Sequence, residues 1–95
     1  MHPAKVVREQ VKQLTDLPNV GPAMADDLRL LGIEQPVQLN GQDPYQLYLR
    51  LCELTGARQD PCVLDVMISL VRFAEGEPPQ AWWHYTAERK KLYSL

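Results

Sequence analysis

The sequence predicts an all-helical domain, and three observations lead to this prediction. Asp43 and Asp60 each precede a proline, the pattern of an N-cap side chain followed by a first helical residue that needs no N–H donor. Glycines at positions 32, 56 and 76 follow apolar runs, where a left-handed residue commonly ends a helix. No alternating apolar and polar pattern is long enough for a strand. We therefore expect a small five-helix domain of the SAM-like, helix-hairpin-helix type.

The individual helices follow from apolar residues at helical spacing. Helices are expected over 4–14, 22–31, 44–54 and 61–74. A short turn of helix is expected at 36–39. The 61–74 segment has almost no polar face, which is typical of a central helix packed on several sides. A last helix is expected to begin near Pro79 or Thr86, and its end, Arg89 to Lys91, is expected to fray.

The length of 95 residues, 45% of them hydrophobic, suits one domain with a modest core. Residues 1–95 are expected to form it, with the hairpin motif at about 4–31 and a flexible tail at 86–95. Apolar runs are shorter than the roughly 20 residues of a membrane span, and no signal-peptide core follows Met1. These features predict a cytoplasmic protein without a membrane partner, in which Cys52 and Cys62 remain thiols.

The most informative motif lies between the first two predicted helices. Leu17-Pro18-Asn19-Val20-Gly21 is too short a connection for anything except a tight hairpin. Asn19 can adopt a left-handed conformation, and Gly21 allows a close backbone approach. Ala25, one turn into the second helix, leaves room for the first. The pattern resembles a helix-hairpin-helix, whose usual hairpin reads Leu-Pro-Gly-Val-Gly; Asn19 stands in the place of the first glycine.

A wider resemblance extends over nearly the full chain. It is carried by five segments: Leu17–Pro22, Leu30–Ile33, Asp43–Tyr48, Asp60–Asp65 and Trp82–Trp83. On these residues the sequence resembles the pathogenicity locus family, a bacterial family of small helix-hairpin-helix proteins. Its members are sometimes labelled mitomycin-resistance-like, and they are similar to the C-terminal domain of the competence regulator TfoX. The resemblance implies a helix-hairpin-helix fold and a DNA-related context, but no particular reaction.

Phosphate binding by such a hairpin uses backbone N–H groups at the start of the second helix. The candidate DNA-backbone residues here are Asn19, Val20, Gly21 and Ala23. Pro22, in the middle of this group, has no N–H to donate. The hairpin therefore predicts weak, sequence-nonspecific binding of double-stranded DNA.

Charge argues against a dedicated DNA-binding protein, because the formal net charge is −2 and phosphate contacts normally need a basic excess. Asp26 and Asp27 follow the hairpin and would repel a phosphate. Lys5, Arg8 and Lys12 are the candidate phosphate contacts that could compensate, since their spacing places them on one stripe of the predicted first helix. The alternative is that this stripe is simply a solvated helix face.

Trp82 and Trp83 form a candidate interface. Neighbouring tryptophans point in different directions, so we expect one in the core and the other exposed. An exposed tryptophan can stack on unpaired bases or anchor a protein partner. The second hypothesis for function is therefore a degenerate helix-hairpin-helix domain that binds a protein or a second copy of itself.

Catalysis, a metal site and a cofactor are not expected. Cys62 could be paired with His84 and an aspartate, but no glycine-rich oxyanion turn flanks it. The candidate zinc ligands contain no closely spaced pair: His2, Cys52, Cys62 and His84. The sequence thus favours a binding module over an enzyme.

Two further features of the sequence have more than one interpretation. Asp65 lies in the most apolar helix and needs a partner, for which Arg58, Arg72 or backbone amides are candidates. Residues 54–58 are a conceivable second hairpin, with weak internal similarity to the first.

Overall fold

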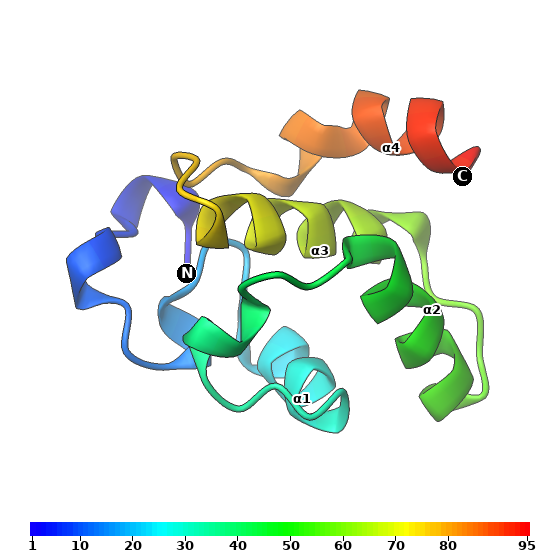
Figure 1. The fold of residues 1–95 in the computed structure, drawn as a ribbon, viewed down its shortest axis with the longest axis horizontal. Coiled ribbons are helices and arrows are strands. Elements are labelled where there is room, and N and C mark those ends of the chain that lie inside the picture. Colours follow the sequence, from blue (N-terminus) through cyan, green and yellow to red (C-terminus); the bar gives the residue numbers. More distant parts are fainter.

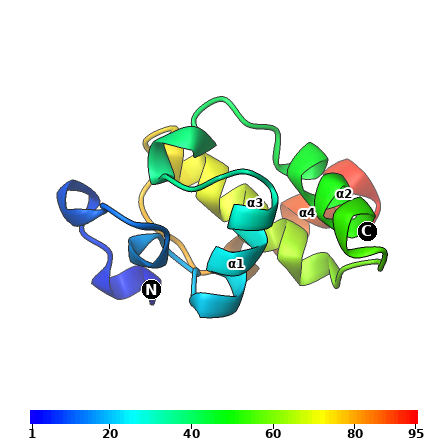
Figure 2. The same ribbon diagram turned by 90° about the horizontal axis from the view of Figure 1, so that it is seen from below.

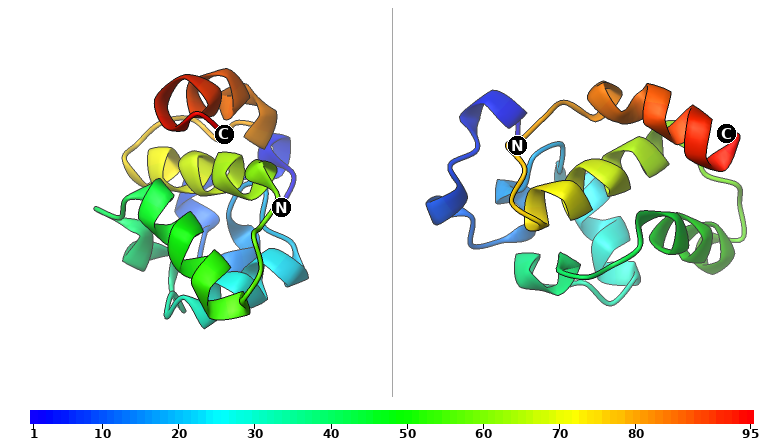
Figure 3. Two further views of the ribbon diagram at one scale, coloured as in Figure 1. Left: turned by 90° about the vertical axis from the view of Figure 1, so that its right-hand side faces the viewer. Right: turned by 45° about the horizontal axis from the view of Figure 1, so that its top comes forward.

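A computed structural model describes all residues, 1–95, and it is helical throughout, with no strand. Four α-helices are joined by 3₁₀ turns: α1 (Pro22–Leu30), α2 (Pro44–Thr55), α3 (Pro61–Ala74) and α4 (Thr86–Tyr93). Helix α3 runs through the middle, with α4 on one side and α1 and α2 on the other (Figure 1 and Figure 3). The all-helical prediction is confirmed, whereas the five-helix helix-hairpin-helix arrangement is not, because one expected helix does not form.

Local capping explains why α2 and α3 begin where the sequence predicts. The Asp43 carboxylate accepts a hydrogen bond from the Tyr45 N–H at 2.9 Å. The Asp60 carboxylate accepts one from the Cys62 N–H at 2.9 Å. Gly56 ends α2 in the left-handed conformation, with φ of 66°. The turn predicted at 36–39 is also present as a 3₁₀ turn.

The core is built around α3, in which every residue from Leu64 to Val71 is buried. Buried leucines of the hairpin, α1 and α2 pack on one face of it, including Leu17, Leu28 and Leu51. Tyr48 and Tyr85 cover another face together with Leu64 and Ile68. The predicted central position of this apolar helix is therefore confirmed. None of the four helices has the length and hydrophobicity required to cross a membrane.

The helix predicted over 4–14 is wrong. Three separate 3₁₀ turns replace it: Pro3–Lys5, Arg8–Gln10 and Leu14–Asp16. Val6, Val7 and Val11 adopt extended backbone conformations between these turns. β-Branched side chains lose rotamer freedom in a helix, so this segment gains little from helix formation. The 3₁₀ turn at Leu14–Asp16 therefore precedes the hairpin in place of a full helix. Figure 2 shows how the interrupted segment leads from the N-terminus to α1.

Asp65 finds its partners on α4, and both partners differ from those predicted. One carboxylate oxygen accepts from Arg89 Nε at 2.8 Å, and the other accepts from Thr86 Oγ1 at 2.7 Å. Arg72 of α3 instead pairs with Glu88, which is also on α4. The sequence does not indicate this partner, because Arg89 is 24 positions away and its side chain is buried against α3 only by the return of the chain.

Candidate functional site

A hollow of about 430 Å³ opens between the hairpin, the N-terminal segment and the tryptophan pair. We call it the hairpin hollow, and its lining residues are Met1, His2, Pro3, Asn19, Val20, Gly21, Trp82 and Trp83. It brings together the two surfaces that the sequence named as separate candidates. None of its lining residues is acidic, although the chain has 12 aspartates and glutamates.

Asn19 connects the two walls of the hairpin hollow. Its φ of 66° confirms the predicted left-handed conformation. The side-chain amide donates to Ser69 Oγ at 3.0 Å and to the Gln80 carbonyl at 2.8 Å. Its oxygen accepts from the Trp82 N–H at 3.2 Å. These bonds hold the tryptophan segment at a fixed position relative to the hairpin, which a glycine at the same position would not do.

The four candidate DNA-backbone amides are not equivalent. The Asn19 N–H already donates to the Met1 carbonyl at 2.8 Å, and the Val20 N–H makes a longer bond of 3.4 Å within the turn. The N–H groups of Gly21 and Ala23 have no acceptor within the protein, and both residues are exposed. Two of the four donors are therefore free to bind an external anion at the start of α1.

The predicted role of Gly21 in a close backbone approach is wrong. Its φ of −100° and ψ of −173° are extended backbone that any residue can adopt. A Cβ atom built there meets nothing within 4 Å. The tight turn depends on Asn19 instead, which carries the positive φ of the hairpin.

Two acidic residues lie on α1 beyond the hairpin hollow. Asp26 pairs with Arg29 at 3.0 Å on an exposed surface. Burial, reinforced by the neighbouring Asp26 carboxylate, raises the pKa of Asp27 above its usual value. These charges disfavour a phosphate farther along α1, so an anion would be confined to the first turn.

The stripe of basic residues predicted on the first helix does not form. Arg8 donates to the carbonyls of Phe73 and Glu77, at 2.6 Å each, and its guanidinium lies 3.9 Å from the centre of the Phe73 ring. Arg8 therefore attaches the N-terminal segment to the end of α3. Lys5 ends the first 3₁₀ turn and Lys12 lies between the second and third; both are exposed, and their contact with phosphate stays a prediction.

The tryptophan pair divides as predicted. Trp82 packs against the main core, whereas Trp83 is 64% exposed. The two rings meet edge to face, with centroids 5.4 Å apart and planes at 84°. Trp82 thus supports Trp83, and the ring of Trp83 remains available to a ligand at the edge of the hairpin hollow.

Comparison with known proteins shows the family of the chain. Its residues 7–91 match the pathogenicity locus family. It is also 48% identical over 79 residues to the mitomycin resistance protein McrB of Streptomyces lavendulae, which covers 83% of this chain and 75% of that protein. This chain belongs to the pathogenicity locus family. No solved structure matches it significantly.

The family match extends over most of the hairpin hollow, including the hairpin, Asn19 and both tryptophans, but it begins after the first three lining residues. The predicted membership in the pathogenicity locus family is confirmed. The predicted similarity to TfoX stays a prediction.

A Cys–His–Asp arrangement is not assembled in this pathogenicity locus protein. Both oxygens of Asp65 accept hydrogen bonds from side chains of α4. The exposed His84 ring packs edge-on against Tyr85, with ring centroids 5.0 Å apart. Asp60 caps α3 through the Cys62 N–H. Burial, followed by the Asp60 carboxylate, raises the pKa of the Cys62 thiol. No group of three potential metal ligands lies close together either.

Cys62 is therefore expected to react slowly with iodoacetamide, because its raised pKa keeps the thiolate fraction low. In a Cys52→Ser variant at pH 8, labelling of the native protein should be several-fold slower than labelling in urea. Mass spectrometry of timed samples measures both rates. Equal rates, or faster labelling of the native protein, would contradict a raised pKa for this thiol.

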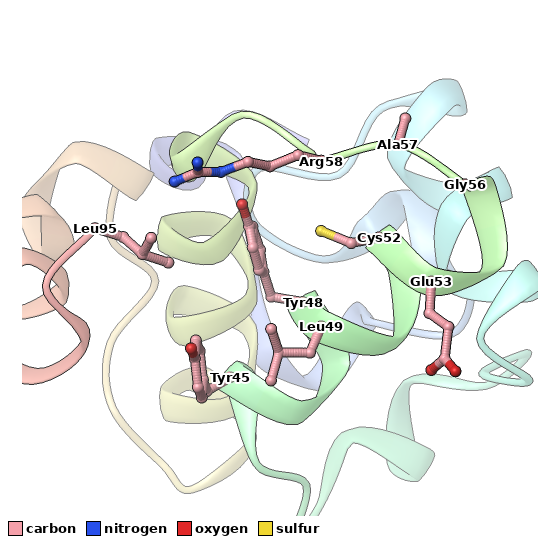
Figure 4. Close-up of a pocket in the computed structure, with 9 residues that line it drawn as sticks. All are labelled: Tyr45, Tyr48, Leu49, Cys52, Glu53, Gly56, Ala57, Arg58 and Leu95. Atoms are coloured by element: carbon pink, nitrogen blue, oxygen red, sulfur yellow. The ribbon is translucent and has the colours of Figure 1, made fainter.

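A second hollow, of about 470 Å³, was not predicted from the sequence. Figure 4 shows its nine lining residues: Tyr45, Tyr48, Leu49, Cys52, Glu53, Gly56, Ala57, Arg58 and Leu95. The Tyr48 hydroxyl donates to the Gln59 carbonyl at 2.5 Å, and burial raises its pKa. In Figure 4 the Glu53 carboxylate points away from the Arg58 guanidinium. The helical spacing on α2 predicts a core face, and only the fold shows that Leu95 lies across from it.

Proposed function

We propose that this chain is a non-catalytic binding module that holds double-stranded DNA weakly and without sequence preference, through the backbone of its hairpin. The observation that supports this best is the pair of free N–H groups of Gly21 and Ala23 at the start of α1. The partial positive charge of a helix N-terminus favours an anion at this position. A DNA phosphate is an anion of suitable chemistry, and backbone donors read no base sequence.

The charges of the chain suggest that such binding is weak. A net charge of −2 gives no general attraction to DNA, and Asp26 and Asp27 limit contact to the first turn of α1. Few phosphates are then contacted, so few counterions are released. We expect a dissociation constant in the micromolar range or weaker at physiological salt, of the order found for nonspecific complexes (about 10⁻⁴ to 10⁻⁶ M).

Ala23→Asp is the variant that tests the hairpin. A carboxylate in the first turn of α1 favours the helix dipole, so the fold should be retained, but it repels a phosphate. We expect duplex affinity to fall by about tenfold or more, which corresponds to about 1.4 kcal/mol. Fluorescence anisotropy with a labelled random duplex at low salt measures the change. Gln46→Glu is the matched control, because it adds the same charge to the first turn of α2, outside the hairpin hollow.

Equal affinities of the two variants would exclude a phosphate at the hairpin amides.

The relative's name also leads us to propose a role in mitomycin resistance for this chain. The same pair of variants tests that role in a mitomycin-sensitive host, where protection should be lost with Ala23→Asp and kept with Gln46→Glu.

Binding of a protein, or of a second copy of the chain, is the alternative function, and the exposed Trp83 favours it. Tryptophan is among the residues that most often dominate interface energies. In that case Ala23→Asp would be nearly silent, and Trp83→Ala would break the complex. Absence of duplex binding by the wild-type protein at low salt would favour this alternative.

A further inference from the structure

Trp83 is the only aromatic residue among the large exposed apolar side chains, and it borders a hollow with polar donors. The residue is 64% exposed, and its ring is supported edge-on by Trp82. The exposed Leu92, by contrast, lines none of the four hollows of the structure. The ring of Trp83 therefore offers a flat π surface at the entrance to an existing hollow.

The chemistry of the hairpin hollow suits a planar ligand attached to an anion. Its volume of about 430 Å³ lies within the range of small-ligand pockets, roughly 300–1,000 Å³. It has no acidic lining residue, and the free N–H of Gly21 and the side chain of His2 are on its walls. A negatively charged side chain of the protein itself does not compete for these donors.

The geometry of the hairpin hollow is fixed before a ligand arrives. The three side-chain bonds of Asn19 connect the hairpin to Ser69 of α3, to Gln80 and to Trp82. The loop that carries Trp83 consequently keeps its distance from the Gly21 N–H. A preorganised site loses less conformational entropy on binding, and this increases affinity for a ligand that contacts both walls.

We propose that the hairpin hollow binds an unpaired nucleobase of single-stranded DNA, stacked on Trp83. Every base has a π face, so aromatic stacking tolerates any sequence. In a duplex both faces of a base are covered by its neighbours, and the base cannot enter without unstacking. The chain therefore prefers single strands to duplexes. This inference rests on the proposed function, because the adjoining phosphate would lie at the hairpin amides.

The test compares three labelled probes of equal length by anisotropy: an oligothymidine, an oligomer of abasic sites and a random duplex. The wild-type protein should bind oligothymidine about tenfold more tightly than the abasic oligomer, because stacking of one base has an effect of about this size. Trp83→Leu keeps apolar area but removes the π face, so its affinity for oligothymidine should fall to that of the abasic oligomer. Trp83→Phe should retain most of the affinity. Leu92→Ala, which removes an exposed apolar side chain elsewhere, should have no effect.

Several outcomes would overturn this inference while leaving the proposed function intact. One outcome is that Ala23→Asp lowers the affinity for the duplex while Trp83→Leu leaves the affinity for oligothymidine unchanged. Another is an equal loss of oligothymidine affinity with Trp83→Leu and Trp83→Phe, which would show that the π face of the residue does not carry the contact. A third is that Trp83→Leu lowers the affinity for all three probes by the same factor. Failure of the proposed function is distinguishable, since it requires that Ala23→Asp leaves duplex binding unchanged or that the wild-type protein does not bind the duplex at low salt.

Discussion

Replacement of Asp65 by alanine is expected to lower the free energy of unfolding by about 3–5 kcal/mol, the usual cost of removing one partner of a buried ion pair. Asp65 is completely buried, and its two oxygens accept from Arg89 Nε at 2.8 Å and from Thr86 Oγ1 at 2.7 Å. The variant leaves the Arg89 guanidinium, whose side chain is only 9% exposed, without its carboxylate. Native domains have total stabilities of about 5–15 kcal/mol, so this loss is a large fraction.

Urea denaturation followed by circular dichroism measures this change. Asp26→Ala is the control, because the Asp26–Arg29 pair is of similar length, 3.0 Å, but lies on the surface. Exposed pairs contribute about 0–1 kcal/mol, so its effect should be small. A double variant, Asp65→Leu with Arg89→Met, should recover most of the loss by replacing the pair with apolar groups. Similar effects of Asp65→Ala and Asp26→Ala would show that α4 is not held to α3 by this pair.

The parts of the fold that the sequence predicted correctly depend on local chemistry. Helices α2 and α3 start at aspartates that cap them, and these caps involve residues two or three positions apart. The apolar composition of α3 likewise identifies a central helix without knowledge of its neighbours. The 4–14 segment has a helical apolar spacing too, but its three valines favour extended backbone, and the spacing alone could not show this.

Long-range contacts account for what the sequence could not predict. Asp65 and Arg89 are 24 positions apart, and Asn19 and Trp82 are 63 apart. No periodicity relates such pairs, because each contact is decided by how helices pack and where loops return. The hairpin and the tryptophans were therefore recognised individually as candidate sites. Their union in one hollow, and the use of Arg8 to attach the N-terminal segment to α3, appear only in the folded chain.

The role of Asn19 leads to the second large effect. Asn19→Ala should lower the free energy of unfolding by about 4–5 kcal/mol. Three side-chain hydrogen bonds are lost, each of which contributes roughly 1 kcal/mol. In addition, alanine at a φ of 66° costs about 1–2 kcal/mol relative to a residue that tolerates the left-handed region. Thermal and urea unfolding measure the combined loss.

Asn19→Gly separates these two contributions, since glycine accepts the positive φ but makes none of the side-chain bonds. This variant also restores the glycine that helix-hairpin-helix motifs usually have at the position. We expect it to be about 1 kcal/mol more stable than the alanine variant and clearly less stable than the wild type. Both variants release Trp82 from the hairpin, so affinity for oligothymidine should fall in both, whereas duplex affinity at the free amides of Gly21 and Ala23 should change less. A glycine variant with wild-type stability and wild-type oligothymidine affinity would show that the side chain of Asn19 neither stabilises the domain nor positions Trp83.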